Sequence, residues 1–209
     1  MIFSTGCVLL LAVSMLSCRL GTAEKDAPDL LKTAAATLSG GSFWCLEAAF
    51  ERLPGVLSVI NGYTGGSEKN PTYPDVYTGT TGHVEAVLIE YDPAKISFLR
   101  LLHVFWKNIN PVQTNGQFSD VGPQYRSIIF FHDDDQQKQA EQSKRDMDNS
   151  KRFAAPIMTE IRPFIGFYPA EGLHQDFYKR NPLRYEYYRF GSGRDQFFRK
   201  IWGRPPQKQ

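Results

Sequence analysis

Short apolar runs, each bounded by turn-forming residues, recur along the chain and predict β-strands. The strongest run is at residues 83–91, which is rich in β-formers and is closed by Asp92 and Pro93. The run at residues 125–131 is continuously apolar toward its end, as in a buried strand. Shorter runs of the same kind lie at residues 34–38, 56–60 and 157–161.

Between these runs, the spacing of apolar and charged residues predicts helices. At residues 97–106 the apolar side chains recur on one helical face, and Ser97 is the expected N-cap. Residues 133–151 carry acidic residues first and basic residues later, which matches the helix dipole. Further helices are predicted near residues 42–53 and 170–179.

Strands and helices alternate, but the connections between them differ in length and one of them is a long polar loop ending near Gly82. This favours an α+β fold over a doubly wound parallel one. We expect a two-layer α/β sandwich with a mixed sheet and a ferredoxin-like core, formed by residues 33–203 as one domain. From Asn181 onward the chain is aromatic and arginine-rich, with Gly191 and Gly193, so we expect a long irregular C-terminal tail.

Residues 1–23 are predicted to be a signal peptide rather than part of the fold. The apolar segment at residues 8–16 is too short to span a bilayer as a helix, and small residues at 21–23 suit a cleavage site. Cleavage before Cys18 is the alternative, because the preceding residues loosely resemble a bacterial lipoprotein signal. The protein is therefore expected to be exported, as a periplasmic or secreted protein, with a lipid anchor at Cys18 in the second case.

Composition narrows the classes of partner and cofactor. The formal net charge of +2 is too small to indicate nucleic acid or an anionic membrane as the main partner. After signal cleavage only Cys45 surely remains, so neither an internal disulfide nor a paired-cysteine metal site is expected. The four histidines are scattered without the spacing of zinc ligands, and we expect no metal and no bound cofactor.

The junction at residue 42 is the most informative candidate site. Gly40 and Gly41 allow a tight turn between the first strand and the first helix, which places Ser42 at a helix N-terminus. Backbone N–H groups and the helix dipole stabilise an anion there and lower the pKa of a thiol, yet the residue carries a hydroxyl. The alternative is that Ser42 is a simple N-cap. Phe43 and Trp44 follow at the mouth of the helix, where they either line a pocket or belong to the core.

Glu85 is the second candidate, because it lies at the start of the strand predicted at residues 83–91. If it is buried, the loss of hydration raises its pKa and makes it a proton donor near neutral pH. The alternative places it on a solvated strand face. Tyr73 and Tyr125 can supply hydroxyl donors, although a buried tyrosine with a satisfied hydroxyl is the commoner finding. The later cluster of tyrosines at 185, 187 and 188 is interpreted as core, with a binding role as the alternative.

Long motifs give the chain a strong resemblance to the peptide methionine sulfoxide reductase A family. The resemblance extends over about residues 37–203 and implies a two-layer α/β sandwich. It depends on the segments GGSFWCLEAAF, GVLSVINGYTGG, NPTYPDVYTGTTGHVEAV, DVGPQYRSIIFF, FYPAEGLHQDFY and NPLRYEYYRFGSGRDQFFRKIWG.

The resemblance implies a role for each candidate residue. The family has a nucleophilic cysteine where this chain has Ser42, and Cys45 occupies a second cysteine position found in some members. Oxidised methionine, free or in proteins, is the implied substrate, and a thioredoxin-like dithiol is the implied reductant. The other implied roles are binding of the S-methyl group by Phe43 and Trp44, proton donation by Glu85, assistance from Tyr73 and Tyr125, and support from Asp120.

A serine at position 42 puts the reduction itself in question. The two electrons that reduce a sulfoxide come from a thiolate that becomes a sulfenic acid, and a hydroxyl oxygen has no equivalent step. Three hypotheses follow: a reductase whose activity Ser42 has removed, a domain that binds methionine sulfoxide without reducing it, and a reductase that uses Cys45 instead. The third assumes that Cys45, three residues further on, faces roughly the same side of the helix.

Overall fold

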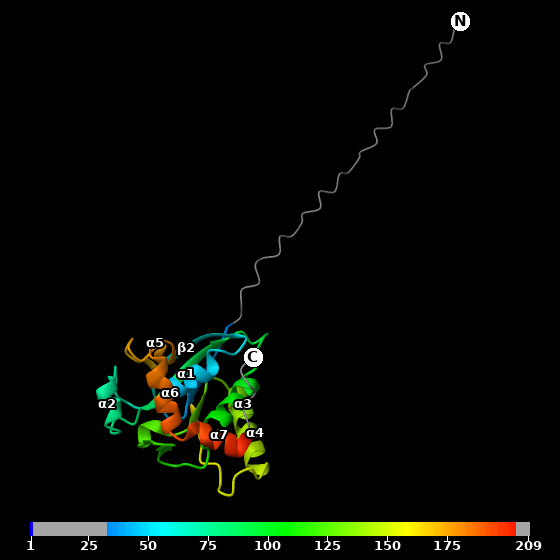
Figure 1. Ribbon diagram of the computed structural model, residues 1–209. Helices are drawn as coiled ribbons and strands as arrows, with labels where there is room; N and C mark the ends of the chain where they lie inside the picture. Colours follow the sequence, from blue (N-terminus) through cyan, green and yellow to red (C-terminus); the bar gives the residue numbers. More distant parts are fainter. Residues whose placement is uncertain (2–32, 204–209) are drawn as a thin grey trace. The chain divides into compact units, whose positions relative to one another are not determined.

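The computed structural model describes Met1 and residues 33–203 of the chain, and the fold below is that of residues 33–203 (Figure 1). The predicted signal peptide and Cys18 lie outside the described residues. In the described part of the chain, no helix is long and apolar enough to cross a membrane.

A six-stranded mixed sheet forms one layer of the domain. Its strand order is β7-β6-β1-β3-β2-β8, and every neighbouring pair is antiparallel except β6 and β7. The order β6-β1-β3-β2, with helices linking β1 to β2 and β3 to β6, is the expected ferredoxin-like core. The strands are β1 (Ala34–Ser39), β2 (Val56–Thr64), β3 (Val84–Tyr91), β6 (Ile128–Phe131), β7 (Glu160–Pro163) and β8 (Tyr168–Pro169).

Three helices form the second layer: α1 (Phe43–Phe50), α3 (Phe98–Asn108) and α4 (Asp134–Asn149). They cover one sheet face because α1 contacts β2 and β3, α4 contacts β6 and β7, and α3 lies between the two helices. Apolar side chains from both layers meet in one cluster, including Leu38, Leu46, Val87, Leu102, Phe105 and Ile129, all completely buried. The predicted α+β sandwich is therefore confirmed.

The local signals at the helix starts are also confirmed. The Ser97 hydroxyl accepts from the Arg100 N–H (3.2 Å), and the carboxylate of Asp133 accepts from the Gln136 N–H (2.8 Å). The loop expected before residue 82 contains the short helix α2 (Tyr73–Tyr77), which Thr72 and Asp75 stabilise through a capping box. A short hairpin of β4 (Gly116–Gln117) and β5 (Asp120–Val121) precedes the 3₁₀-helix η1 (Pro123–Tyr125).

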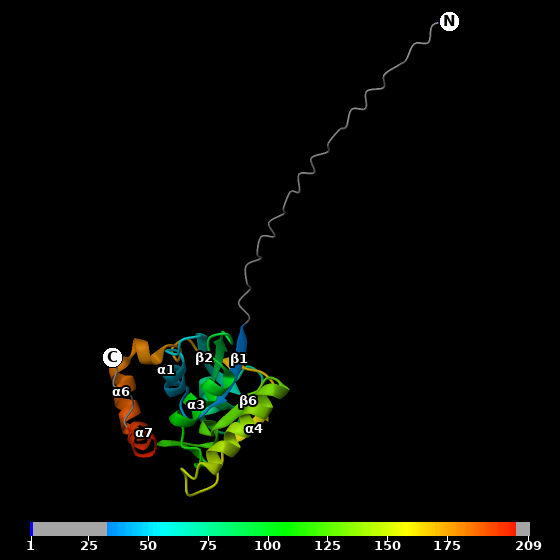
Figure 2. The same ribbon diagram turned by 90° about the vertical axis from the view of Figure 1, so that its right-hand side faces the viewer.

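The expectation of an irregular C-terminal tail is wrong. After the short helix α5 (Phe177–Arg180), which is all that forms of the helix predicted at 170–179, two helices follow: α6 (Pro182–Gly191) and α7 (Arg194–Trp202). Pro182 at the first turn of α6 suits a helix start, and Gly193 takes a positive φ of 83° that separates α6 from α7. Figure 2 shows α6 and α7 on the side of α1 and α3 that faces away from the strands.

Gly41 in the turn before α1 has no room for a side chain. Its φ is +80°, and an added Cβ would lie 2.5 Å from Arg194 Nη2 and 2.8 Å from Gln117 Cβ. Gly41→Ala is therefore expected to lower the free energy of unfolding by about 2 kcal/mol or more, measured by urea denaturation. Gly191→Ala is the matched control, because nothing lies within 4 Å of that position and its φ is not positive. Equal effects of the two substitutions would show that the turn is not constrained.

Candidate active site

A pocket of about 550 Å³ opens at the N-terminal end of α1. Segments that are far apart in sequence build its wall: the start of α1, helix α2, strand β3, the chain from β5 to η1, and helix α6. All seven residues predicted to act on the substrate line it: Ser42, Phe43, Trp44, Tyr73, Glu85, Asp120 and Tyr125. The fold therefore brings together the residues that the motifs singled out.

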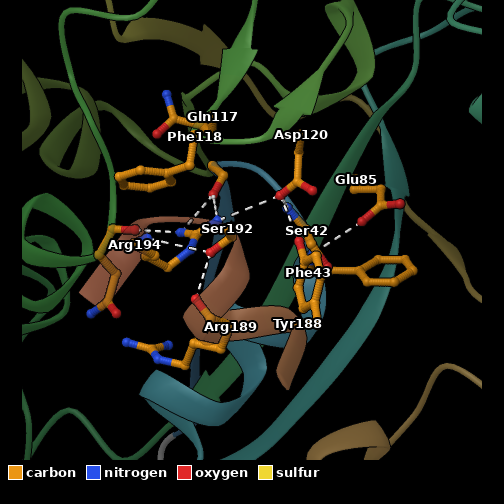
Figure 3. A network of polar contacts seen from close by, with 12 residues as sticks. Ser42, Phe43, Glu85, Gln117, Phe118, Asp120, Tyr188, Arg189, Ser192 and Arg194 are labelled. Atoms are coloured by element: carbon orange, nitrogen blue, oxygen red, sulfur yellow. Dashed lines mark hydrogen bonds and ion pairs between the residues drawn. The ribbon is translucent and has the colours of Figure 1, made fainter. Parts of the chain in front are cut away.

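Ser42 occupies the N-cap position of α1, but its hydroxyl makes no capping hydrogen bond. The residue is only 6% exposed and lies against the pocket. Its backbone N–H donates to Asp120 Oδ2 (3.3 Å), and the Phe43 N–H donates to Glu85 Oε2 (3.0 Å), as Figure 3 shows. Two carboxyl groups therefore bind the amides at the start of the helix, and the Ser42 hydroxyl is not used for capping.

Glu85 is buried, with 3% of its surface exposed, so the interpretation of a solvated strand face is wrong. Loss of hydration raises the pKa of Glu85 to about 8, and the nearby charge of Asp120 adds to this, while the hydrogen bond from the Phe43 N–H opposes it. The carboxyl group is therefore mostly protonated at neutral pH. One oxygen accepts from Phe43 and the group retains a proton to donate into the pocket.

Tyr73 and Tyr125 line the same pocket as Glu85. Burial raises the pKa of Tyr73 to about 12, with the charge of Glu85 as the next cause. Burial and the charge of Glu85 raise the pKa of Tyr125 as well. Both phenols therefore keep their protons and can act as hydrogen-bond donors to a polar atom of a ligand.

Phe43 and Trp44 form an apolar wall beside these donors. The Phe43 ring packs 6.1 Å from the Tyr63 ring and 5.3 Å from the His174 ring, measured between centroids. The indole of Trp44 stacks on Phe177 with a centroid distance of 3.8 Å. The two aromatic residues are therefore held from behind by α5 and the segment before it, while they also line the pocket.

Cys45 does not face the pocket, contrary to the expectation. Its side chain is completely buried in a separate cluster with Phe177, Tyr178 and Tyr185. Burial raises the pKa of the Cys45 thiol, although the positive charge of Arg194 opposes the shift. A protonated thiol with no access to the pocket is a poor nucleophile.

Native Cys45 is expected to resist alkylation by iodoacetamide at pH 8, at a rate at least about a hundredfold below that of the urea-unfolded chain. Burial of the sulfur and its raised pKa both slow the reaction. Mass spectrometry of the peptide that carries residue 45 separates its modification from that of Cys7 and Cys18. Equally fast modification in native and unfolded protein would contradict the buried position.

Two site residues lie in the segment that the sequence pattern indicated to be irregular. Tyr188, interpreted from sequence as core, lines the pocket and donates from its hydroxyl to Asp120 Oδ2 (2.6 Å). Arg194 is 1% exposed and has its Nη2 3.9 Å from the same oxygen. The sequence held two signals, which were the density of tyrosine and arginine after Asn181 and the family motif at residues 181–203, which contains both residues. Among the described residues, no group of three or more His, Cys, Asp or Glu side chains could hold a metal ion.

Comparison with known proteins agrees with this geometry. The family model of peptide methionine sulfoxide reductase matches residues 34–206. The peptide methionine sulfoxide reductase MsrA of Bacillus licheniformis is 47% identical over 85% of this chain and 98% of its own length, and that of Halalkalibacterium halodurans is 48% identical over 81% and 96%.

Solved structures of the same kind share the fold. Reduced Mxr1 from Saccharomyces cerevisiae matches 74% of this chain and 89% of its own, with a TM-score of 0.69 and 29% identity. Methionine sulfoxide reductase A of Corynebacterium diphtheriae matches 72% and 76%, with a TM-score of 0.68 and 32% identity. The chain therefore belongs to the peptide methionine sulfoxide reductase family, whose members are oxidoreductases that act on methionine sulfoxide.

Proposed function

We propose that the pocket binds the S-epimer of methionine sulfoxide, free or within a polypeptide, and that the chain with Ser42 holds this group without reducing it. The observation that carries the proposal is the pairing of a protonated, buried Glu85 with an apolar wall of Phe43 and Trp44 around an uncapped Ser42 hydroxyl. A methyl sulfoxide has the matching parts, which are one strong acceptor oxygen and one small apolar methyl group.

In this arrangement the sulfoxide oxygen accepts from Glu85, with Tyr73 and Tyr125 as further donors, and the methyl group contacts the aromatic wall. The sulfur then lies toward residue 42. With a cysteine there, a thiolate would attack sulfur, the sulfoxide oxygen would end on the cysteine as a sulfenic acid, and two electrons would pass to the methionine sulfur. The hydroxyl oxygen of Ser42 cannot supply these two electrons, so the reaction does not proceed beyond binding.

The geometry does not favour Cys45 as a substitute nucleophile, because its sulfur lies in the cluster behind α1 and not in the pocket. The source of the ligands and the nature of the reductant are inferred from the sequence. The ligands are oxidised methionines of exported proteins, periplasmic or secreted. A form with a cysteine at position 42 would need a thioredoxin-like dithiol to return the sulfenic acid to the thiol.

Calorimetric titration of the full chain tests the binding. Peptides that carry the S-sulfoxide should bind more tightly than the matching R-sulfoxide and thioether peptides, and no thioether peptide should form from the sulfoxide peptide during hours of incubation with dithiothreitol. Tyr125→Phe should weaken sulfoxide binding about threefold to tenfold through loss of one donor. Tyr187→Phe, on the exposed side of α6, is the control and should change nothing. Equal affinities for sulfoxide and thioether would remove the proposal.

A further inference from the structure

Arg194 is a fully buried cation directly behind the turn that precedes α1. It is the first residue of α7 and only 1% exposed. Its Nη1 donates to the carbonyl oxygens of Asn108 and Gly40, and its Nη2 donates to Gly40 as well (3.4 Å). The guanidinium carbon lies 4.6 Å from the centre of the Phe118 ring. The residue thus connects the C-terminal helix to a turn that lies more than a hundred and fifty residues earlier.

A buried charge of this kind is costly unless nearby groups compensate for it. The carbonyl oxygens and the Phe118 ring do so only in part, and the Arg194 Nε has no hydrogen-bond partner among the described residues. The nearest carboxylate is Asp120, whose Oδ2 is 3.9 Å from Arg194 Nη2.

The link to the pocket runs through the single oxygen Oδ2 of Asp120. This oxygen faces the guanidinium, accepts from the Ser42 N–H (3.3 Å) and accepts from the Tyr188 hydroxyl (2.6 Å), as Figure 3 shows. Arg194 is therefore linked to residue 42 through two groups. One is the carbonyl of Gly40, to which it donates, and the other is the carboxylate of Asp120, which accepts from the Ser42 N–H.

We propose that Arg194 is a positioning residue of the site, which fixes the turn at Gly40 and Gly41 and orients Asp120 so that residue 42 points into the pocket, with the positive charge of the guanidinium offsetting that of the Asp120 carboxylate. The inference rests on the proposed function for the meaning of that pocket, but the field at residue 42 can be measured without any ligand. Arg194 itself does not line the pocket and acts through Gly40 and Asp120.

The electrostatic field at residue 42 is best measured through the pKa of the thiol in the Ser42→Cys variant. The ionisable groups that face this position come from every neighbouring element and are Glu85 on β3, Asp120 on β5, Tyr73 on α2, Tyr125 in η1, Tyr188 on α6 and Arg194 on α7. Glu85 and the tyrosines are neutral near pH 7, so Asp120 and Arg194 are the charged pair closest to the turn.

The experiment compares the pH dependence of alkylation of residue 42 in Ser42→Cys full chains, followed by mass spectrometry of the peptide that carries it. Adding Arg194→Met should move the midpoint upward by about one pH unit, because a nearby cation favours the thiolate. Arg199→Met, an exposed arginine on the same helix, should leave the midpoint unchanged. In the Ser42 chain, Arg194→Met should also weaken binding of the S-sulfoxide peptide at least about fivefold, since the amide of residue 42 loses its fixed partner.

An unchanged midpoint in a folded Arg194→Met chain overturns the proposal. If that variant does not fold, Arg194→Lys decides. A lysine keeps the charge but cannot reproduce the forked contacts to Gly40 and Asn108, so the midpoint should stay while peptide affinity falls. A lysine variant with full affinity overturns the positioning role. If no chain binds the sulfoxide at all, the proposed function fails, and the alkylation midpoint still decides the role of Arg194.

Discussion

Ser42→Cys is expected to raise the rate of methionine sulfoxide reduction, with dithiothreitol as the reductant, at least about a thousandfold above the chain with Ser42. The reason is that one atom is missing from a site that is otherwise assembled. The donor Glu85, the tyrosine hydroxyls and the aromatic wall already surround residue 42, and the start of α1 stabilises a thiolate there. Conversion of a sulfoxide peptide to its thioether form, followed by chromatography, measures the rate.

Two controls separate the role of residue 42 from that of Cys45. Ser42→Cys combined with Cys45→Ala should keep the first reduction step, with about one thioether peptide formed per chain before any reductant is added. Cys45→Ala alone should leave the Ser42 chain without turnover. Reduction by the Ser42 chain that disappears with Cys45→Ala would instead identify Cys45 as the nucleophile. A folded Ser42→Cys chain that stays inactive would show that the pocket is not a sulfoxide site.

The position of Cys45 shows where reasoning from spacing fails. Residues three apart face the same side only when both have helical backbone angles. Ser42 is the N-cap, with φ −57° and ψ 128°, so its side chain leaves the helix in a direction that the helical period does not give. Cys45, within the helix, follows the period and turns to the cluster formed with α5 and α6. Because Ser42 lies at the helix boundary, its side chain and that of Cys45 point in different directions, although the sequence pattern had placed them on one side.

Most strands of the sheet, the main helices and seven pocket residues could be predicted because their signals are local: apolar periodicity, the cap at Ser97, the charge order of residues 133–151, and contiguous motifs. Arg194 and Tyr188 could not, because their importance comes from contacts to Gly40 and Asp120 that only the folded chain creates. The helices of the C-terminal segment were missed for a related reason. Glycines at 191 and 193 indicated irregular structure, whereas only Gly193 adopts a positive φ.

Binding of methionine sulfoxide to the Ser42 chain is expected to weaken as the pH rises through about 8, by up to tenfold for each further pH unit. Burial raises the pKa of Glu85 to about 8, so below that value the carboxyl group is protonated and can donate to the sulfoxide oxygen. Above it, the carboxylate must first regain a proton before it can donate. The affinity is therefore full on the acid side of the folded pKa and is lost on the basic side. Calorimetric titrations between pH 6 and pH 10 measure the profile.

Glu85→Gln is the matched variant, because an amide is neutral and nearly isosteric. Its oxygen can still accept from the Phe43 N–H and its nitrogen can donate into the pocket, so the variant should bind the sulfoxide with an affinity that no longer depends on pH.

The tyrosines do not account for the profile, since burial places the pKa of Tyr73 near 12 and raises that of Tyr125 as well. Glu47, whose pKa burial raises to about 7, lies outside the pocket lining, and Glu47→Gln should leave the profile in place. The same decline in affinity in the Glu85→Gln chain would mean that another group supplies the proton. A flat profile in both chains would mean that Glu85 does not donate to the ligand.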